Sequence, residues 1–228
     1  CISQMVREDV RRHFAVPDAK LHVIYNAVDP REFGPGVRQH RAAMRQRLGL
    51  APDHVAFLLV GSDYARKGVP AALRALARLS PRAQLVVVGR EKDPARYETL
   101  ARREGVRSRV VFAGPQQDPR PYLGAADAFV LPTLYDPLGN AVLEALACGL
   151  PVVTSRRCGA GELVAAHGAG ALCDAADAAA LAAEMERLLD PALRARMGPR
   201  ATAAVAALTP EAMTSRLLAL YGSLGAGT

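Results

Sequence analysis

The chain of 228 residues contains no tryptophan, and its six tyrosines and five phenylalanines are spread along the sequence. It therefore lacks the aromatic residues interleaved with lysine and arginine that RNA-binding and single-strand-binding proteins use for base stacking. No apolar run approaches the roughly 20 residues of a membrane-spanning helix. The four cysteines, Cys1, Cys148, Cys158 and Cys173, form no Cys-x-x-Cys pair and have no histidine at metal-ligand spacing. We expect reduced thiols in a cytosolic protein.

Several common site motifs are missing as well. The sequence has neither the Gly-x-x-x-x-Gly-Lys-Ser/Thr spacing of a P-loop nor the Gly-x-Gly-x-x-Gly of a dinucleotide site. It has no Asp-x-Asp metal motif, and none of its five histidines has a partner at a spacing that suggests chemistry. The chain begins at Cys1 and not at methionine, so we expect a fragment or a processed chain.

The charge is strongly basic, with 29 Lys and Arg against 22 Asp and Glu and a net charge of +7. Such a balance favours phosphate-rich partners: nucleotides, nucleic acid or an anionic lipid surface. It is equally typical of proteins from arginine-rich and alanine-rich proteomes, so charge alone leaves these alternatives open.

Apolar strand-like segments alternate with amphipathic ones almost throughout the chain. This pattern predicts an α/β fold with a Rossmann-like parallel sheet and helices on both of its faces. Strands are expected at 21–25, 55–60, 84–88, 109–112, 128–131, 151–154 and 171–173. Helices are expected at 3–14, 37–48, 68–79, 94–104, 119–125, 140–148, 161–166, 178–189, 193–206 and 210–221, with residues 222–228 frayed. Ligands of such sheets bind beyond the carboxyl ends of the strands, where the loops at Gly61, Gly89, Gly114 and Pro132 are expected to converge.

The most informative stretch runs from Tyr135 to Thr154. Asp136 lies in a Pro-Leu-Gly turn before a predicted helix, and Glu144 lies on the second turn of that helix. Both carboxylates therefore border a helix N-terminus, whose free N–H groups and partial positive charge suit an anion. A site of this kind can hold a phosphate and sugar hydroxyls together.

A second loop, Gly61-Ser62-Asp63-Tyr64-Ala65-Arg66-Lys67-Gly68, joins a strand to a helix. Its glycines permit close approach of the backbone, Arg66 offers a planar fork for a phosphate, and Lys67 offers a mobile point charge. Basic residues at a helix N-terminus oppose the helix dipole, so local stability does not explain them. They predict a phosphate-binding loop.

These motifs resemble those of the retaining, family 4 glycosyltransferases of the GT-B fold. The family has Glu, seven residues and Glu, followed by Ala-x-x-x-Gly-x-Pro-Val; Asp136 departs from it, whereas Glu144 and the run from Ala145 to Val152 match. The Arg-Lys-Gly loop and the segments 24–29 and 122–127 also match, and Tyr-Asp-Pro is similar to the branch of lipopolysaccharide core glucosyltransferases I. The chain is identified as resembling the C-terminal, donor-binding domain of such an enzyme.

The resemblance implies roles for individual residues. Arg66 and Lys67 would grip the diphosphate of a nucleotide-sugar, Asp136 would hold a sugar hydroxyl, and Glu144 would bind the ribose; these four form the expected catalytic set. The expected substrate-binding residues are Gly61, Ser62, Arg90, Gly114, Pro115, Gln116, Leu138, Gly139, Asn140 and Ala141. The backbone near Arg90 and Gly114 to Gln116 would hold the base. Basic side chains replace a divalent metal in this scheme, so neither metal nor cofactor is expected.

The implied organisation is one nucleotide-sugar-binding domain over residues 1–228. Residues 209–222 would form a helix that crosses back to an N-terminal, acceptor-binding half absent from this chain. The expected reaction moves a hexose, glucose first of all, from a UDP-sugar to a cell-envelope glycan or glycolipid such as lipopolysaccharide core. Two alternatives remain: a stand-alone nucleotide-sugar-binding module, and a GT-B relative that hydrolyses or epimerises a UDP-sugar.

Partners and location follow from the same resemblance. No nucleic-acid partner is expected. The expected location is the cytoplasm, with peripheral contact at the inner face of the membrane left to the full-length protein. The choice of UDP over GDP or ADP is not fixed by the sequence.

Overall fold

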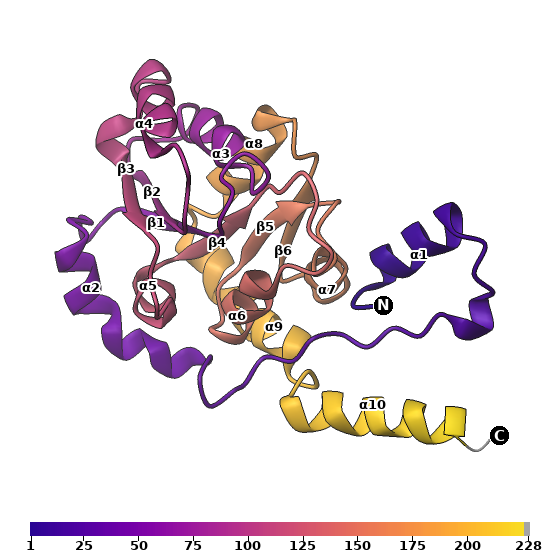
Figure 1. Cartoon of the computed structure of the whole chain (residues 1–228). Coiled ribbons are helices and arrows are strands. Elements are labelled where there is room, and N and C mark those ends of the chain that lie inside the picture. Colours follow the sequence, from indigo (N-terminus) through magenta and orange to yellow (C-terminus); the bar gives the residue numbers. More distant parts are fainter. Residues whose placement is uncertain (226–228) are drawn as a thin grey trace.

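A computed structural model of the chain describes residues 1–225 and has a six-stranded sheet at its centre (Figure 1). All neighbouring strands are parallel, in the order β3-β2-β1-β4-β5-β6. The strands are β1 (Val55–Val60), β2 (Ala83–Val88), β3 (Val110–Gly114), β4 (Ala128–Leu131), β5 (Val152–Ser155) and β6 (Gly170–Cys173). The predicted Rossmann-like α/β fold is therefore confirmed.

Helices cover both faces of the sheet, which explains why the strands are almost continuously apolar. On one face lie α3 (Val69–Leu76), α4 (Pro94–Arg103) and α8 (Ala178–Arg187) (Figure 1). On the other lie α5 (Arg120–Ala125), α6 (Asn140–Ala147), α7 (Gly161–His167) and α9 (Pro191–Val205), with α2 (Arg41–Arg47) packed on α5. The central side chains Phe57, Leu85 and Phe129 are completely buried between these layers.

The strand order creates a switch point between β1 and β4. From β1 the chain builds outward through β2 to β3, then returns to place β4 on the other side of β1 and builds outward again through β5 to β6. The helices that follow β1 and β4, α3 and α6, consequently lie on opposite faces of the sheet. Open parallel sheets bind their ligands in the crevice that such a divergence leaves.

Asp127 joins the two strands of the switch point at their amino ends. Its N–H donates to the carbonyl of Ala56 at 2.8 Å, and its carboxylate accepts the Ala56 N–H at 2.8 Å. The same carboxylate is paired with Arg45 at 3.0 Å and Arg41 at 2.6 Å. A buried carboxylate satisfied in this way fixes the register of the strands that carry the two loops.

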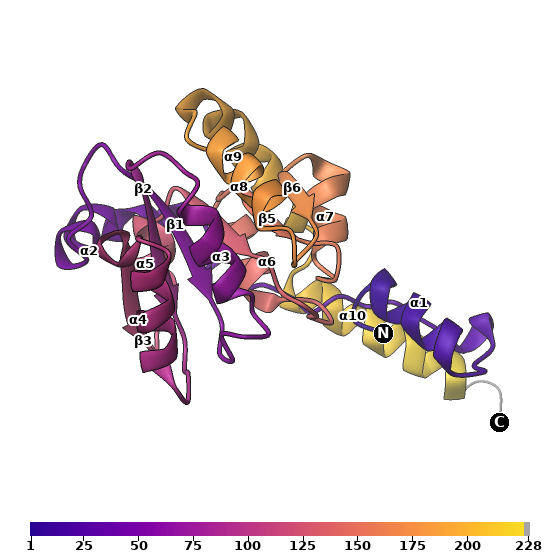
Figure 2. The same ribbon diagram turned by 90° about the horizontal axis from the view of Figure 1, so that it is seen from above.

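Two helices stand away from the sheet, α1 (Gln4–His13) at one end of the chain and α10 (Pro210–Gly225) at the other (Figures 1 and 2). Helix α10 confirms the predicted helix, and its Leu218 side chain is 65% exposed. Its crossing to an upstream half remains a prediction. Within residues 1–225, no helix is both long enough and apolar enough to cross a membrane.

Three sequence predictions need correction. Residues 21–25 are extended but join no strand, because their backbone pairs with the N-terminal residue: the Ile24 N–H donates to the Cys1 carbonyl and the Cys1 amino group donates to the His22 carbonyl. The helix expected over 37–48 divides into a 3₁₀ segment, Pro35–His40, and α2. Fraying from Gly222 is wrong as far as Gly225, where α10 ends; residues 226–228 lie outside the described part of the chain.

Candidate functional site

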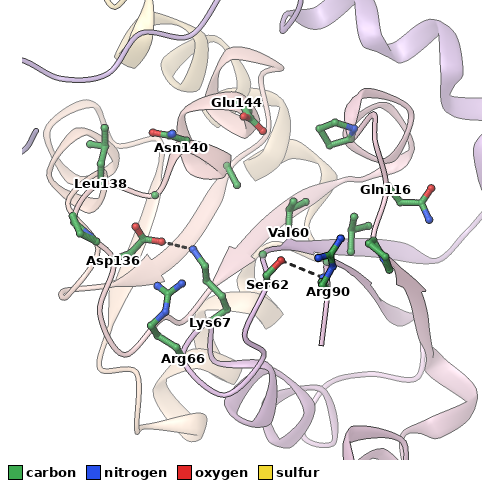
Figure 3. Close-up of a pocket in the computed structure, with 18 of the residues that line it drawn as sticks. Val60, Ser62, Arg66, Lys67, Arg90, Gln116, Asp136, Leu138, Asn140 and Glu144 are labelled. Carbon is green, nitrogen blue, oxygen red and sulfur yellow. Dashed lines mark hydrogen bonds and ion pairs between the residues drawn. The ribbon is translucent and has the colours of Figure 1, made fainter. Parts of the chain in front are cut away.

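A cavity of about 840 Å³ lies beyond the carboxyl ends of β1, β2 and β4 (Figure 3). Every residue predicted for the site lines it, except Gly114: Arg66, Lys67, Asp136, Glu144, Gly61, Ser62, Arg90, Pro115, Gln116, Leu138, Gly139, Asn140 and Ala141. Gly114 lies one step behind the wall, where its carbonyl accepts the N–H of the lining residue Gly89 at 2.9 Å. The switch point thus brings the two predicted loops to one cavity.

The loop after β1 packs directly on the loop after β4. Gly68 has a φ of +82°, and a Cβ there would lie 2.0 Å from the carbonyl oxygen of Pro132. At Gly61 a Cβ would lie 2.8 Å from the Lys67 side chain. Both the backbone conformation and the available space therefore require glycine at position 68. At position 61, the absence of a side chain leaves room for the Lys67 side chain to reach the cavity.

Lys67 forms an ion pair with Asp136 across the two loops. Its Nζ lies 2.5 Å from Oδ2 of Asp136, and the side chains are 14% and 10% exposed (Figure 3). Sequence reasoning placed both groups in the site but did not predict that they pair. The lysine predicted to hold a phosphate is thus neutralised in this structure by the carboxylate predicted to hold a sugar.

Arg66 is more open and is oriented by backbone groups. Its Nη1 donates to the carbonyl of Tyr135 at 3.1 Å, and its Nε lies 3.4 Å from Asp63. Its own carbonyl accepts the hydroxyl of Thr133 at 2.9 Å, which ties the start of α3 to the loop after β4. With a side chain 42% exposed, Arg66 keeps donor capacity toward the cavity.

The N-terminus of α6 opens into the same cavity. Gly139 caps it in the left-handed conformation, with a φ of +81° and no side-chain cap. Among residues 1–225, the N–H groups of Gly139, Asn140 and Ala141 find no hydrogen-bond acceptor. Free N–H groups and the positive end of the helix dipole make this the part of the cavity best suited to an anion.

Glu144 lies one turn further along α6, half-buried at the cavity wall (Figure 3). Burial raises the pKa of its carboxyl to about 7. In the described part of the chain, no hydrogen bond or ion pair satisfies this carboxylate. Its free oxygens can therefore accept hydrogen bonds from the hydroxyl groups of a ligand.

Two other predicted residues, Arg90 and Gln116, line the cavity from the loops after β2 and β3. The Arg90 N–H donates to the hydroxyl of Ser62 at 3.2 Å, and the Gln116 amide donates to the carbonyl of Ala113 at 2.7 Å. The loop at Gly89 was expected at this edge, whereas six further lining residues were not assigned to the site: Ile2, Asn26, Val60, Val88, Pro119 and Pro137. Val60 and Val88 end the strands that precede two of these loops, so strand ends were a usable signal. Asn26 lies in the family-like segment 24–29, which was not assigned to the cavity, and nothing near Ile2 indicated it.

Other candidate groups lie elsewhere. Cys148, Cys158 and Cys173 are buried free thiols, and burial raises the pKa of each well above its ordinary value. No group of three or more His, Cys, Asp or Glu within residues 1–225 is arranged to hold a metal ion. Metal independence of the chemistry remains a prediction. Glu162 lies outside the cavity lining, and its Oε1 accepts the N–H of Gln4, the first residue of α1, at 3.0 Å.

Comparisons with known proteins show which family and which solved structures this chain is similar to. The family model described as "Glycosyl transferases group 1" matches residues 40–204. The chain is 33% identical over 162 residues to the lipopolysaccharide glucosyltransferase WaaG of Escherichia coli K12, covering 69% of the chain and 43% of the relative. It is 35% identical over 184 residues to the lipopolysaccharide core biosynthesis glycosyltransferase LpsE of Rhizobium meliloti, covering 80% of the chain and 54% of the relative.

Solved structures share the fold of this chain. A crystal structure of WaaG, a glycosyltransferase involved in lipopolysaccharide biosynthesis, has a TM-score of 0.80 at 27% identity and covers 93% of this chain and 60% of that one. Anabaena Alr3699/HepE in complex with UDP and glucose has a TM-score of 0.86 and covers 98% of this chain and 62% of that one; at 24% identity this likeness shows the fold. The chain thus spans about half the length of the curated relatives it matches.

Proposed function

Because this chain belongs to the group 1 glycosyl transferases, we propose that it is the donor-binding part of a retaining hexosyltransferase of family 4. The donor is a UDP-sugar, with glucose as the first hexose to test. The acceptor is a cell-envelope glycan or glycolipid such as lipopolysaccharide core, bound by an upstream GT-B half. Two relatives that act in lipopolysaccharide biosynthesis support this choice.

One observation carries the proposal: a helix N-terminus with free N–H groups, two basic side chains and two carboxylates all face one cavity. Each group suits a different part of a nucleotide-sugar. The N–H groups of α6, with Arg66 and Lys67, would hold the diphosphate. Glu144 would accept hydrogen bonds from the ribose hydroxyls, and Asp136 would hold a sugar hydroxyl.

The proposed chemistry follows from the charges. As the bond from the anomeric carbon to the diphosphate breaks, negative charge builds on the leaving phosphate oxygen and positive charge on the sugar ring. Fixed donors aimed at that phosphate stabilise the developing charge and need no reorganisation when the reaction occurs. Because Arg66 and Lys67 supply this stabilisation, we propose that donor binding needs no divalent metal.

Asp136 is one methylene shorter than the glutamate usual in the family, and the structure suggests how it serves. Its carboxylate is held by Lys67, so the two side chains form a unit that presents both charges at one place. On release of Lys67 to the diphosphate, Asp136 would turn its oxygens to the sugar.

A UDP-sugar hydrolase or epimerase is the second candidate, and the burial of Glu144 at the cavity wall favours it. Such an enzyme needs an acid or base in the cavity, and no histidine lines it. The carboxyl of Glu144, with a pKa of about 7, is the lining group best suited to that task. Release of glucose from UDP-glucose by this chain alone, abolished in Glu144→Gln, would favour this reading.

Calorimetric titration with UDP, GDP and ADP tests the proposal. The wild-type chain should bind UDP, and the double variant Arg66→Ala/Lys67→Ala should lose about 3–6 kcal/mol, which is about 1.5–3 kcal/mol for each charge-assisted hydrogen bond. Arg102→Ala/Arg103→Ala, which removes two exposed charges of α4 that do not line the cavity, is the charge-matched control. Equal binding by both double variants would contradict the assignment.

Cytoplasmic location and peripheral membrane contact through the full-length protein are part of the same proposal. They depend on the acceptor and on the upstream half. A stand-alone nucleotide-sugar-binding module remains the outcome if the chain binds UDP-glucose and the complete protein transfers nothing.

A further inference from the structure

The N-terminal segment, residues 1–29, contributes to the cavity although it lies outside the sheet and outside the family match at residues 40–204. Two of its residues, Ile2 and Asn26, line the cavity. The Asn26 amide donates to Oδ1 of Asn140 at 2.9 Å, at the first residue of α6. The segment therefore meets the proposed anion site directly.

Ser3 makes the most buried of these contacts. Its side chain is completely buried, and its Oγ donates to the carbonyl of Pro137 at 2.6 Å across 134 residues of sequence. The same oxygen accepts the Val6 N–H at 3.1 Å and so caps α1. A single hydroxyl thus joins the start of α1 to the loop between Asp136 and α6.

The loop after β4 rests on a second support beside Ser3. The Asp136 N–H donates to the Arg157 carbonyl at 2.9 Å, and the N–H groups of Gly159 and Ala160 donate to the carbonyls of Asp136 and Leu138 at 3.0 and 2.7 Å. A Cβ at Gly159 would lie 2.2 Å from the Pro137 carbonyl oxygen and 2.6 Å from Ser3 Oγ. The Pro137 carbonyl is therefore enclosed, with Ser3 as its donor.

Further contacts hold α1 in place against the same loops. Glu162 Oε1 accepts both the Gln4 N–H at 3.0 Å and the Tyr25 hydroxyl at 2.5 Å. Near the middle of α1, Asp9 accepts the Tyr135 hydroxyl at 3.3 Å and lies 3.6 Å from Arg157. No residue of α1 is buried, so these polar contacts and Ser3 set its position.

We propose that Ser3 is a positioning residue for the donor site and that α1 acts as a strut for the loop at residues 136–139. This rests on the proposed function. The Pro137 carbonyl lies between the carboxylate of Asp136 and the free N–H groups at the start of α6. A hydrogen bond to that carbonyl fixes the turn that presents both, so packing of α1 and binding of a nucleoside diphosphate are coupled.

A purely structural role makes a different prediction. If Ser3 only caps α1, its loss should lower stability as any lost helix cap does, and should leave nucleotide binding unchanged. Asp177 provides the matched control, because it caps α8 through the N–H groups of Ala179 and Ala180 and lies outside the cavity lining.

The test compares wild type, Ser3→Ala and Asp177→Ala by UDP calorimetry and thermal unfolding. Both variants should unfold at lower temperature, but only Ser3→Ala should bind UDP about tenfold more weakly, which corresponds to about 1.4 kcal/mol. Wild-type affinity in a folded Ser3→Ala would overturn the strut proposal and leave the proposed function intact. If the wild type binds no nucleotide, the proposed function fails. Amide hydrogen exchange then tests the strut proposal independently of nucleotide binding.

Amide hydrogen exchange of the chain without nucleotide provides that readout. Gly159 and Ala160 donate to the loop carbonyls, so their amides should exchange faster in Ser3→Ala and at the wild-type rate in Asp177→Ala. Unchanged exchange in Ser3→Ala would overturn the proposal.

Should Ser3→Ala not fold, Glu162→Ala and Glu162→Gln take its place. The glutamine side chain in Glu162→Gln keeps an oxygen acceptor for the Gln4 N–H and the Tyr25 hydroxyl, whereas Glu162→Ala removes it. Weaker UDP binding in Glu162→Ala, restored in Glu162→Gln, supports the strut, and equal binding overturns it.

Discussion

Removal of the Asp136 charge should raise the affinity for UDP while it lowers stability. Lys67 Nζ lies 2.5 Å from Asp136, and both side chains are mostly buried. A diphosphate that binds here must draw the ammonium away from that carboxylate and must also lie close to a negative charge. Asp136→Asn keeps the shape and the backbone bonds of the loop and removes only the charge.

The expected gain in UDP affinity follows from removing the repulsion between the bound diphosphate and the Asp136 carboxylate. Two unit charges about 4 Å apart interact by about 1 kcal/mol in water and about 4 kcal/mol in a partly buried setting. The cavity is open to solvent, so we expect a gain of about 1–2 kcal/mol for UDP, or roughly 5-fold to 30-fold in affinity. Stability should fall by about 1–3 kcal/mol, because Lys67 keeps its charge and loses its ionic partner.

The assay is calorimetric titration of wild type and Asp136→Asn with UDP and with UDP-glucose, alongside urea unfolding. UDP-glucose should gain less than UDP, since the variant also loses its carboxylate contact with the sugar. The reasoning is refuted if Asp136→Asn binds UDP more weakly than wild type, because Lys67 would then need Asp136 to be in place.

Three further predictions concern Glu144, Gly68 and metal. Burial raises the pKa of Glu144 from 4.5 to about 7 in the folded state, so its contribution to stability is fully present below pH 4.5 and is lost as pH rises through 7. Between pH 5 and pH 8, the unfolding free energy of Glu144→Gln should therefore rise by about 1–3 kcal/mol relative to that of wild type, as measured by urea unfolding. Parallel plots of unfolding free energy against pH for the two proteins would contradict this. Gly68→Ala should lose at least about 2 kcal/mol in unfolding free energy through its contact with Pro132, whereas Gly105→Ala, with a φ of +71° and open space around it, should lose about 1 kcal/mol. UDP affinity should be unchanged by excess EDTA; a loss that Mg²⁺ or Mn²⁺ restores would refute metal independence.

Much of the fold was predictable because its signals are local. Buried strands such as β2 are short apolar runs, and their loops contain glycine where the chain must turn or approach another backbone. The convergence of Lys67 and Asp136 followed from the rule that ligands bind beyond the carboxyl ends of parallel strands. Their presence in one cavity was thus predictable from sequence, although their ion pair was not.

The failures share a different physical cause. Residues 21–25 have a strand-like composition, but their backbone pairs with Cys1 and not with a sheet, and a local pattern does not report which segment will be the partner. The same holds for Ser3, whose cap position is readable from the sequence and whose bond to Pro137 depends on a loop 134 residues away. Contacts of this kind are set by tertiary packing.

A crystal structure of the chain with UDP tests the central claim most directly. The account predicts the diphosphate at the N–H groups of Gly139 to Ala141, with Lys67 moved from Asp136 to a phosphate oxygen and both ribose hydroxyls on Glu144. A nucleotide bound elsewhere on the sheet, or one in the cavity with its ribose away from Glu144 and Lys67 still on Asp136, would contradict it.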